Sequence, residues 1–288
     1  MQLVRFRPSA AATFRPGLVD GGKVHDLGAA YPSIARFMAE FPDGWSAAQA
    51  LKPGHPIHAL KDVELAAPVD DGANVYLVGA NYKKHALEAG LDVPKIPVIF
   101  QKPTSALIGP GAAIHIPAVS TQMDYEGELA VVIGRKARLV KKADAPAYVA
   151  GLTICNDVTA RDLQWVQLGK HNIVDWFSSK CLDRSSPLGP GIVPLAAAGG
   201  DPHRLRLTTH LNGELMQEGE TSLMVFNVWD LVEFCSARVT LNPGDVISTG
   251  TPFGVGGFRK IFLKAGDRLR VEIGGVGALE NRVEKDSS

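Results

Sequence analysis

Short apolar runs bounded by turn residues dominate the chain and predict a fold made mostly of β-strands. The runs are rich in β-branched residues and lie between Gly, Pro, Asn and Asp, as strands typically do. They cover residues 75–80, 97–102, 112–117, 128–134, 151–157, 204–213, 245–250 and 267–275. Residues 32–41 and 228–239 instead repeat apolar positions at i, i+3, i+4 and i+7, which predicts two amphipathic helices. The fold class we expect is mainly β with a few helices (α+β).

The first part of the chain differs from the rest and predicts a small N-terminal module. Residues 1–8 alternate polar and apolar positions, and Gly-containing turn signals follow them. Residues 53–72 are rich in Pro and turn formers, which is typical of a connector. We therefore expect a module over residues 1–66 and a larger domain over residues 67–288.

The balance of charge limits the classes of partner. The chain carries 30 Lys and Arg against 30 Asp and Glu and has no long basic run, which argues against nucleic acid. It has no unbroken apolar stretch of about 18 residues and no signal-peptide pattern at its start. We therefore expect a cytoplasmic protein with no membrane partner. Three scattered cysteines do not make a disulfide framework.

A pair of glutamates and one aspartate suggest a metal site. Alternate residues of a strand point to one face, so Glu126 and Glu128 project together in the run DYEGELAVVIG. Asp157 ends another apolar run. Three carboxylates without Cys or His suit Mg²⁺, Mn²⁺ or Ca²⁺ and leave coordination positions for a chelating substrate. The alternative is a solvated strand face, since such pairs are common.

A histidine and a glutamate three residues apart suggest a general base. His85 and Glu88 lie in the run NYKKHALEAG, whose composition predicts a short helix with both side chains on one face. A carboxylate beside an imidazole fixes its tautomer and raises its basicity. The alternative is a surface pair that contributes a few tenths of a kcal/mol.

Basic and amide side chains near Asp157 suggest substrate contacts. Asp157, Arg161 and Gln164 are spaced four and three apart, so a helical turn could aim all three one way. Arg161 could clamp a substrate carboxylate, or it could form only a surface pair with Asp162. Lys180 could be a buried cation near the site, or an exposed residue at a loop end.

The Gly-rich run STGTPFGVGG at residues 248–257 is not a nucleotide-binding loop. It lacks the GxxxxGK[ST] pattern, and no clear helix is predicted after it to hold a phosphate. We interpret it as a tight loop whose backbone and Thr251 hydroxyl approach a small ligand. The alternative is an ordinary cluster of turns.

Several of these motifs together resemble the fumarylacetoacetate hydrolase family, in the family's order. The matching stretches are VGANYKKHALEAG (78–90), IFQKPTSALIGPG (99–111), DYEGELAVVIG (124–134), TICNDVTARDLQ (153–164), SSKCLDRSSPLGP (178–190) and LNPGDVISTGTPFGVG (241–256). The resemblance implies a β-roll or barrel-like core and a homodimer. It also implies Mg²⁺, or another divalent metal, on carboxylates that match Glu126, Glu128 and Asp157.

The resemblance also assigns roles to the other candidate residues. His85 and Glu88 match a dyad on a lid segment that activates water, and Lys180 matches a residue that stabilises charge. The matches for substrate-contacting or charge-stabilising positions are Lys102, Arg161, Gln164 and Thr251.

The chain departs from the long eukaryotic fumarylacetoacetases, which carry a further acidic ligand shortly before the histidine. Residues 73–84 contain no carboxylate. The chain is more similar to acylpyruvate hydrolases, diketo-acid sugar hydrolases and the hydroxymuconate isomerase branch.

We therefore expect metal-dependent hydrolysis of a C–C bond in a small 2,4-dioxo acid, an acylpyruvate or a 2,4-diketo-3-deoxy sugar acid. The alternatives are isomerisation or decarboxylation of a 2-oxo acid such as oxaloacetate at the same metal site, or a binding protein that kept the fold alone.

Overall fold

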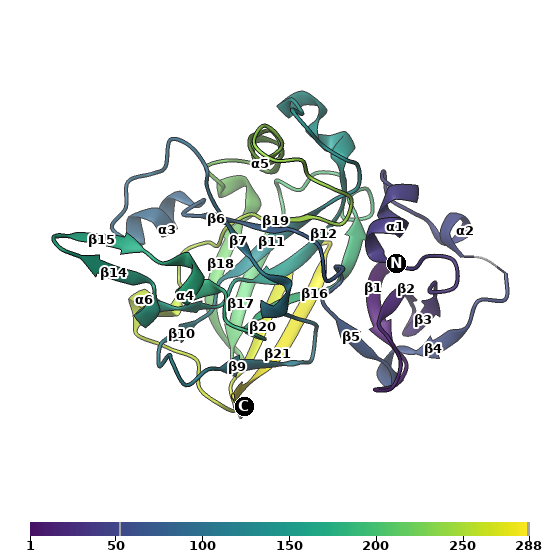
Figure 1. The fold of residues 1–288 in the computed structure, drawn as a ribbon, viewed down its shortest axis with the longest axis horizontal. Coiled ribbons are helices and arrows are strands. Elements are labelled where there is room, and N and C mark those ends of the chain that lie inside the picture. The colour runs from purple at the N-terminus through teal and green to yellow at the C-terminus, as the bar shows by residue number, and fades with distance from the viewer. Residues whose placement is uncertain (52, 287–288) are drawn as a thin grey trace.

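The computed structural model describes residues 1–51 and 53–286, and most of its elements are β-strands (Figure 1). A large sheet runs through the middle of the molecule, and a smaller sheet packs beside it. No helix in the described residues is long and apolar enough to cross a membrane. The expected class, mainly β with a few helices, is confirmed.

The large sheet has twelve strands in the described part of the chain. They are β1 (Gln2–Arg7), β2 (Arg15–Asp20), β3 (Lys23–Asp26), β4 (Ile57–Ala59), β5 (Glu64–Ala66), β6 (Val75–Gly79), β7 (Val98–Lys102), β8 (Leu107–Ile108), β11 (Gly127–Ile133), β12 (Val149–Asn156), β16 (Ser186–Pro194) and β19 (Val246–Ser248). Their order is β4-β3-β2-β1-β16-β12-β11-β19-β6-β7, with β5 paired to β1 and β8 paired to β16. Strand β11 therefore lies near the middle, between β12 and β19.

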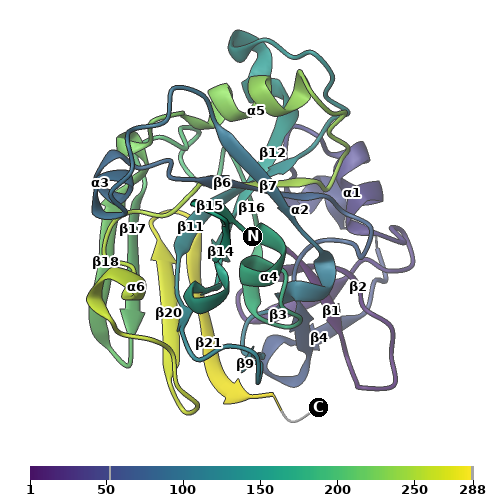
Figure 2. The same ribbon diagram turned by 60° about the vertical axis from the view of Figure 1, so that its left-hand side comes forward.

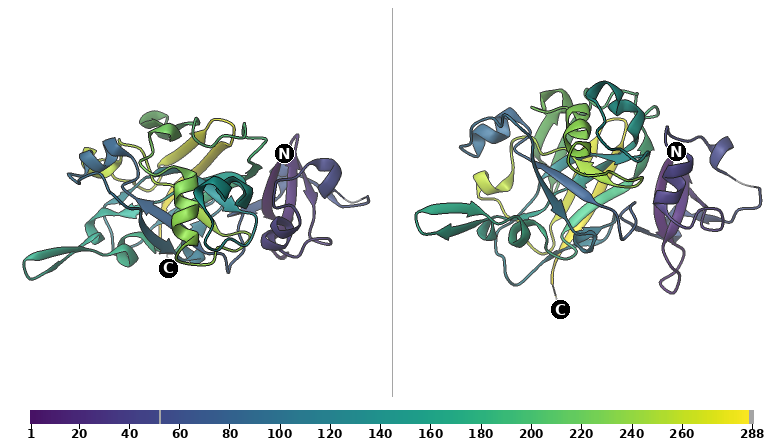
Figure 3. Two further views of the ribbon diagram at one scale, coloured as in Figure 1. Left: turned by 90° about the horizontal axis from the view of Figure 1, so that it is seen from above. Right: turned by 45° about the horizontal axis from the view of Figure 1, so that its top comes forward.

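A five-stranded sheet packs against the large one, in the order β18-β17-β20-β21-β9. Its strands are β9 (Ala113–Ile116), β17 (Arg206–Leu211), β18 (Glu214–Glu220), β20 (Arg268–Ile273) and β21 (Gly277–Lys285). Two small pairs complete the strands: β10 (Met123–Asp124) with β13 (Thr159–Ala160), and β14 (Trp165–Leu168) with β15 (His171–Val174). The hairpin β14–β15 projects from the end of the molecule opposite the N-terminal segment (Figure 3).

The helices are short and lie around the sheets. They are α1 (Ile34–Glu40), α2 (Ala47–Ala50), α3 (Lys83–Glu88), α4 (Trp176–Lys180), α5 (Val228–Ser236) and α6 (Gly256–Arg259), with the 3₁₀ helices η1 (Leu60–Asp62), η2 (Thr104–Ala106), η3 (Lys142–Tyr148), η4 (Arg161–Leu163) and η5 (Thr221–Leu223). Both predicted amphipathic helices are present, as α1 and α5. Asn227 and Asp230 form a capping box that satisfies backbone N–H groups at the start of α5.

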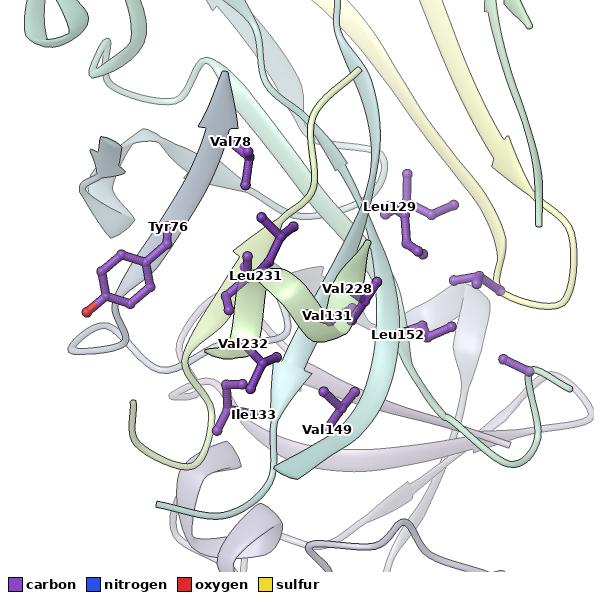
Figure 4. Close-up of a cluster of buried hydrophobic side chains, with 14 of the residues drawn as sticks. Tyr76, Val78, Leu129, Val131, Ile133, Val149, Leu152, Val228, Leu231 and Val232 are labelled. Carbon is purple, nitrogen blue, oxygen red and sulfur yellow. The ribbon is translucent and has the colours of Figure 1, made fainter. Parts of the chain in front are cut away.

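Strand β11 is buried on both faces, and each face packs against a different hydrophobic core. Leu129, Val131 and Ile133 belong to the core that β11 shares with α5 and the five-stranded sheet (Figure 4). Ala130 and Val132 belong to a second core that includes residues of the N-terminal segment. A strand covered on both sides cannot present a solvated face, so that alternative for Glu126 and Glu128 is wrong.

The N-terminal segment continues the large sheet. Strand β1 pairs with β16, with Leu3 opposite Ile192. The views show residues 1–66 at one side of the molecule (Figures 1 and 3). The division into a module over residues 1–66 and a domain over residues 67–288 stays a proposal.

Helices α3, α4 and α6 lie together with the hairpin β14–β15 at the opposite side of the molecule (Figures 1 and 2). The segments with the candidate residues therefore meet at one end of the fold. The predicted short helix around His85 is α3.

Candidate active site

Three buried carboxylates meet where β11 begins and β12 ends. The two strands are antiparallel, with Glu128 opposite Cys155. The backbone N–H of Asp157 donates to the carbonyl of Glu126 at 2.9 Å, which closes the ladder at this end. One carboxylate oxygen each of Glu126, Glu128 and Asp157 lies within 4.8 Å of the other two. The fold thus brings together the three residues that the sequence suggested as metal ligands.

Two buried lysines approach these carboxylates. Lys180, at the end of α4, places Nζ 2.7 Å from Oε2 of Glu126 and 2.5 Å from Oδ2 of Asp157. Lys102, at the end of β7, places Nζ 2.6 Å from Oδ1 of Asp157 and also donates to the Ser186 hydroxyl. Lys180 is thus a buried cation and not an exposed loop residue. The contacts of Lys102 fit charge stabilisation behind the carboxylates.

Within the three carboxylates, positive side chains compensate the charge of Glu126 but not that of Glu128. Burial would raise the pKa of Glu126, but the charges of Lys180 and Arg161 outweigh it and lower that pKa to about 2. Burial and the negative charges of Asp157 and Glu126 raise the pKa of Glu128 well above its ordinary value. Three converging oxygen donors with unbalanced negative charge fit a hard divalent cation.

Arg161 uses its guanidinium on protein acceptors. Nε donates to Asp124 at 2.8 Å, Nη2 to Glu126 at 2.5 Å and Nη1 to the Gln164 amide oxygen at 3.3 Å. The predicted helical turn is present only in its second part, as η4, where it brings Arg161 and Gln164 together. Asp157 lies outside it, because the strand β13 comes between. The alternative pair with Asp162 is wrong, because that carboxylate accepts from Ser120 and Thr121.

The histidine and glutamate of α3 stand beside the carboxylates. Nδ1 of His85 lies 3.5 Å from Oε2 of Glu88 but forms no hydrogen bond within the described part of the chain, and the histidine is buried. Glu88 accepts a hydrogen bond from the backbone N–H of Gly254 at 3.2 Å. The ring of Phe258 packs edge-on to that of His85, with centroids 6.2 Å apart. The pair is therefore enclosed and is not a surface pair.

A cavity of about 590 Å³ joins these groups. The polar site residues that line it are His85, Glu126, Glu128, Arg161, Gln164, Lys180 and Thr251. Its apolar wall includes Phe100 and Trp176, which stack at 4.3 Å. Glu88, Lys102 and Asp157 lie behind the lining and act on it through their neighbours. A largely apolar pocket with converging polar groups is typical of a small-molecule site.

The Gly-rich loop supports the cavity, and one expectation about it needs correction. A short helix, α6, does follow the loop. Its first N–H groups, those of Gly256 and Gly257, donate to the buried Asp124 at 2.7 and 2.8 Å, so they are not free for a phosphate. Thr251 lines the cavity, and its hydroxyl donates to the carbonyl of Gly127 at 2.9 Å.

Three residues that hold the site together were not predicted from the sequence. Asp124 had a signal, because it alternates with Glu126 and Glu128 in the same run. Ser186 binds Lys102, and Ser248 donates to Glu128 at 2.5 Å. Small hydroxyls within strands carry no sequence signal for such contacts, because their partners are distant in the chain.

A cavity that brings a histidine to a cluster of carboxylates and lysines is typical of the active site of an enzyme. The chain belongs to the fumarylacetoacetate hydrolase family, since the model of the fumarylacetoacetate (FAA) hydrolase C-terminal family matches residues 74–284.

Known proteins of this fold carry several activities. The chain is 43% identical over 292 aligned residues, 98% of this chain and 90% of its relative, to the protein named oxaloacetate tautomerase fahd2, mitochondrial, of Xenopus laevis. A solved 5-carboxymethyl-2-hydroxymuconate delta-isomerase from Mycobacterium smegmatis is 35% identical, with a TM-score of 0.77 over 99% of this chain and 100% of that one. A maleylpyruvate hydrolase from Sphingobium sp. SYK-6, solved with manganese(II) and pyruvate, is 29% identical, with a TM-score of 0.80 and all of both chains covered.

Proposed function

We propose that the chain is a divalent-metal-dependent enzyme that interconverts the enol and keto forms of a 2-oxo acid, with oxaloacetate as the first substrate to test. The observation that carries the proposal is the convergence of Glu126, Glu128 and Asp157 beside Lys180 at the cavity of His85. Tautomerisation needs a base for one C–H proton and a site that stabilises negative charge on oxygen. The name of the Xenopus laevis relative supports this reaction.

Glu126, Glu128 and Asp157 would hold the metal. When bound, a divalent cation would act as a Lewis acid on the 2-oxo group and make the neighbouring C–H more acidic. We propose Mg²⁺, because the donors are all carboxylate oxygens. Manganese(II) in the maleylpyruvate hydrolase structure makes Mn²⁺ the next metal to test, followed by Ca²⁺.

Lys180 would stabilise the developing enolate oxygen. An ammonium has three N–H donors, and two of those of Lys180 point to Glu126 and Asp157. One donor remains for a substrate oxygen. Burial opposes the charge of Lys180, but Asp157 and Glu126 outweigh it and raise its pKa, so the lysine stays a cation.

His85 would remove the C3 proton and return it. Its Nδ1 forms no hydrogen bond among the residues that the structure describes, and Glu88, 3.5 Å away, lies close enough to orient the ring. Gly254 holds Glu88 from the other side. The wall of Phe100 and Trp176 keeps water away from the proton in transit.

Hydrolysis of a C–C bond in a 2,4-dioxo acid is the second candidate. The enclosed His85–Glu88 pair favours it, because the same base could activate water. The maleylpyruvate hydrolase neighbour supports it too. Both reactions require a stabilised enolate, and they differ in whether water attacks a distal carbonyl. Decarboxylation of oxaloacetate would need the same enolate without that water.

One assay panel separates these reactions. Enol absorbance and pyruvate release are followed for oxaloacetate, acetylpyruvate and a 2,4-diketo-3-deoxy sugar acid, with Mg²⁺ or with EDTA and with a blank without enzyme. We expect EDTA-sensitive loss of the oxaloacetate enol without pyruvate release. His85→Ala should slow it by about 100-fold or more, whereas His171→Ala, an exposed residue of β15, should not.

Two outcomes would overturn the proposal. Pyruvate release from acetylpyruvate or the sugar acid without enol conversion of oxaloacetate would establish the hydrolase. Pyruvate release from oxaloacetate at the rate of enol loss would establish a decarboxylase.

A further inference from the structure

One cation of the cavity wall has no partner in the protein. Three basic side chains line the cavity: Arg161, Lys180 and Lys260. Arg161 donates to three acceptors, and Lys180 contacts two carboxylates. Within residues 1–51 and 53–286, the side chain of Lys260 makes no ion pair and no hydrogen bond, and it is exposed. Lys260 is therefore available to a ligand.

We propose that Lys260 binds the second carboxylate of a dicarboxylic 2-oxo acid and so determines the substrate class. The inference rests on the proposed function, and it adds a binding group for the end of the substrate that the metal would not contact. The metal and Lys180 would engage the 2-oxo acid end of a substrate. The other end of a dicarboxylate still needs a positive charge within the same cavity.

The backbone fixes Lys260 at this wall. It follows α6, and its N–H donates to the carbonyl of Gly256. Asp124 accepts hydrogen bonds from the N–H groups of Gly256 and Gly257 and also from Arg161. One buried carboxylate therefore connects α6, which precedes Lys260, to Arg161 in the site. The turn is so tight that a Cβ on Gly256 would clash with the carbonyl oxygen of Ile261.

Lys260 adopts a backbone conformation that costs energy. Its φ is 57° and its ψ 35°, in the left-handed region that bulky residues rarely occupy and glycine occupies freely. Glycine would thus suit the turn better than lysine. The lysine side chain at this place therefore has no conformational advantage for the fold, which favours a role in binding.

An unpaired carboxylate of the cavity wall disfavours a dianion. Glu126 and Glu128 line the cavity, but the bound metal would neutralise them. The exposed Asp92 also lines the cavity and forms no ion pair within the described residues. Asp92 would repel a second substrate carboxylate, and Lys260 would offset that repulsion and steer dianions inward.

The test compares two acids of equal length. In 2-oxobutanoate a methyl group replaces the distal carboxylate of oxaloacetate. Exchange of the C3 protons in D₂O, read by NMR with Mg²⁺ present, gives kcat/KM for both acids, corrected for exchange without enzyme. Lys260→Met should lower kcat/KM for oxaloacetate about fivefold and leave 2-oxobutanoate unchanged.

Further variants separate charge from structure. Lys260→Arg should restore the preference for oxaloacetate. Lys260→Gly should lose the preference and keep or raise the Tm, because the strain is removed. High salt should shrink the difference between the wild type and Lys260→Met.

Equal loss for both acids, or no loss for either, would overturn the role of Lys260. If the wild type exchanges neither acid, the proposed function fails, and calorimetry on the Mg²⁺-loaded protein decides the inference separately. Lys260 is supported if wild-type protein binds oxaloacetate more tightly than 2-oxobutanoate and Lys260→Met binds them alike. Equal binding by the wild type would contradict it.

Discussion

At the floor of the cavity, Glu128 differs from Glu126 and Asp157 because no lysine contacts its carboxylate. It accepts hydrogen bonds from the Ser248 hydroxyl at 2.5 Å and from the N–H of Gly250 at 3.0 Å. A buried carboxylate held by neutral donors beside two other carboxylates is costly while it is ionised. The position makes sense when a divalent cation neutralises it.

Glu128→Gln should therefore stabilise the metal-free protein and abolish tight metal binding. We expect the free energy of unfolding without metal to rise by about 1 kcal/mol near pH 7. Since the folded pKa is raised, ionisation costs stability as pH rises above the ordinary value of 4.5, so the gain should vanish below it.

Chemical denaturation with EDTA and calorimetric titration with Mn²⁺ measure the two effects. Asp183→Asn, which changes an exposed carboxylate outside the cavity, is the control. Unchanged metal affinity in Glu128→Gln would contradict the ligand role.

The site residues that could be predicted from the sequence are those whose spacing within one short run is informative. Glu126 and Glu128 lie two residues apart at the start of β11, and His85 and Glu88 lie within α3, so each pair is local in the sequence. The partners of Lys102 and Asp124 lie 55 and 132 residues away in the chain, so only the folded sheet reveals them.

Among the elements, β10, η4 and α6 depend on one another through Asp124. The carboxylate of Asp124, the last residue of β10, accepts from Arg161 of η4 and from the first N–H groups of α6. Burial raises the pKa of Asp124, although Arg161 opposes that rise. Asp124 is thus a positioning residue, because it orders other groups and does not line the cavity.

Asp124→Asn should misplace Arg161 and α6 together. We expect kcat/KM for oxaloacetate to fall by about tenfold to 100-fold, since small displacements of binding groups cost that much. Metal affinity should change less, because Glu126 keeps Lys180. Kinetics and Mn²⁺ titration on the same preparation check both, with the exposed Asp183→Asn as the control. A loss of metal affinity as large as the loss of activity would contradict this role.

In the N-terminal segment, Asp26 of β3 makes stability depend on pH. Burial would raise the pKa of Asp26, but hydrogen bonds from the Arg15 side chain at 2.8 Å and the Gly28 N–H at 2.8 Å lower it. A lowered folded pKa contributes stability above the ordinary value of 3.8, and that stability is lost as pH falls through the folded value.

Asp26→Asn should cost about 1–2 kcal/mol of unfolding free energy near pH 7. The difference from the wild type should shrink between about pH 4 and pH 2. Denaturation across this range measures it, with exposed Asp20→Asn as control. A cost that stays constant down to pH 2 would show that ionisation of Asp26 is not involved.

Over the whole molecule, two hydrophobic cores share the central strands. Leu3, Leu18 and Phe37 of the N-terminal segment belong to the same core as Ala130 and Val132 of β11. The strands that form from apolar runs were predictable because each run is local, whereas the Gly- and Pro-containing β16 was not predicted. The pairing of the strands could not be predicted, because β16 pairs with β1 and β12, and β1 is far from β16 in the sequence.

Removal of residues 1–66 should destabilise the remaining domain, including the site. The truncation would uncover the β11 face of Ala130 and Val132 and the edge of β16. We expect an aggregating product or a Tm lower by 10 °C or more, on the order expected for a loss of several kcal/mol of apolar burial. Thermal unfolding measures this. A soluble truncated chain with unchanged Tm and metal affinity would contradict the shared core.

The central claim is that metal held by Glu126, Glu128 and Asp157 lets His85 move the C3 proton of a 2-oxo acid. Exchange of the C3 protons of oxaloacetate in D₂O, followed by NMR, observes that proton directly, whatever happens to the distal carbon. We predict exchange above the rate without enzyme with Mg²⁺, a return to that rate with EDTA, and a loss of about 100-fold or more in His85→Ala. Exchange that survives EDTA, or that His85→Ala leaves unchanged, would contradict the account.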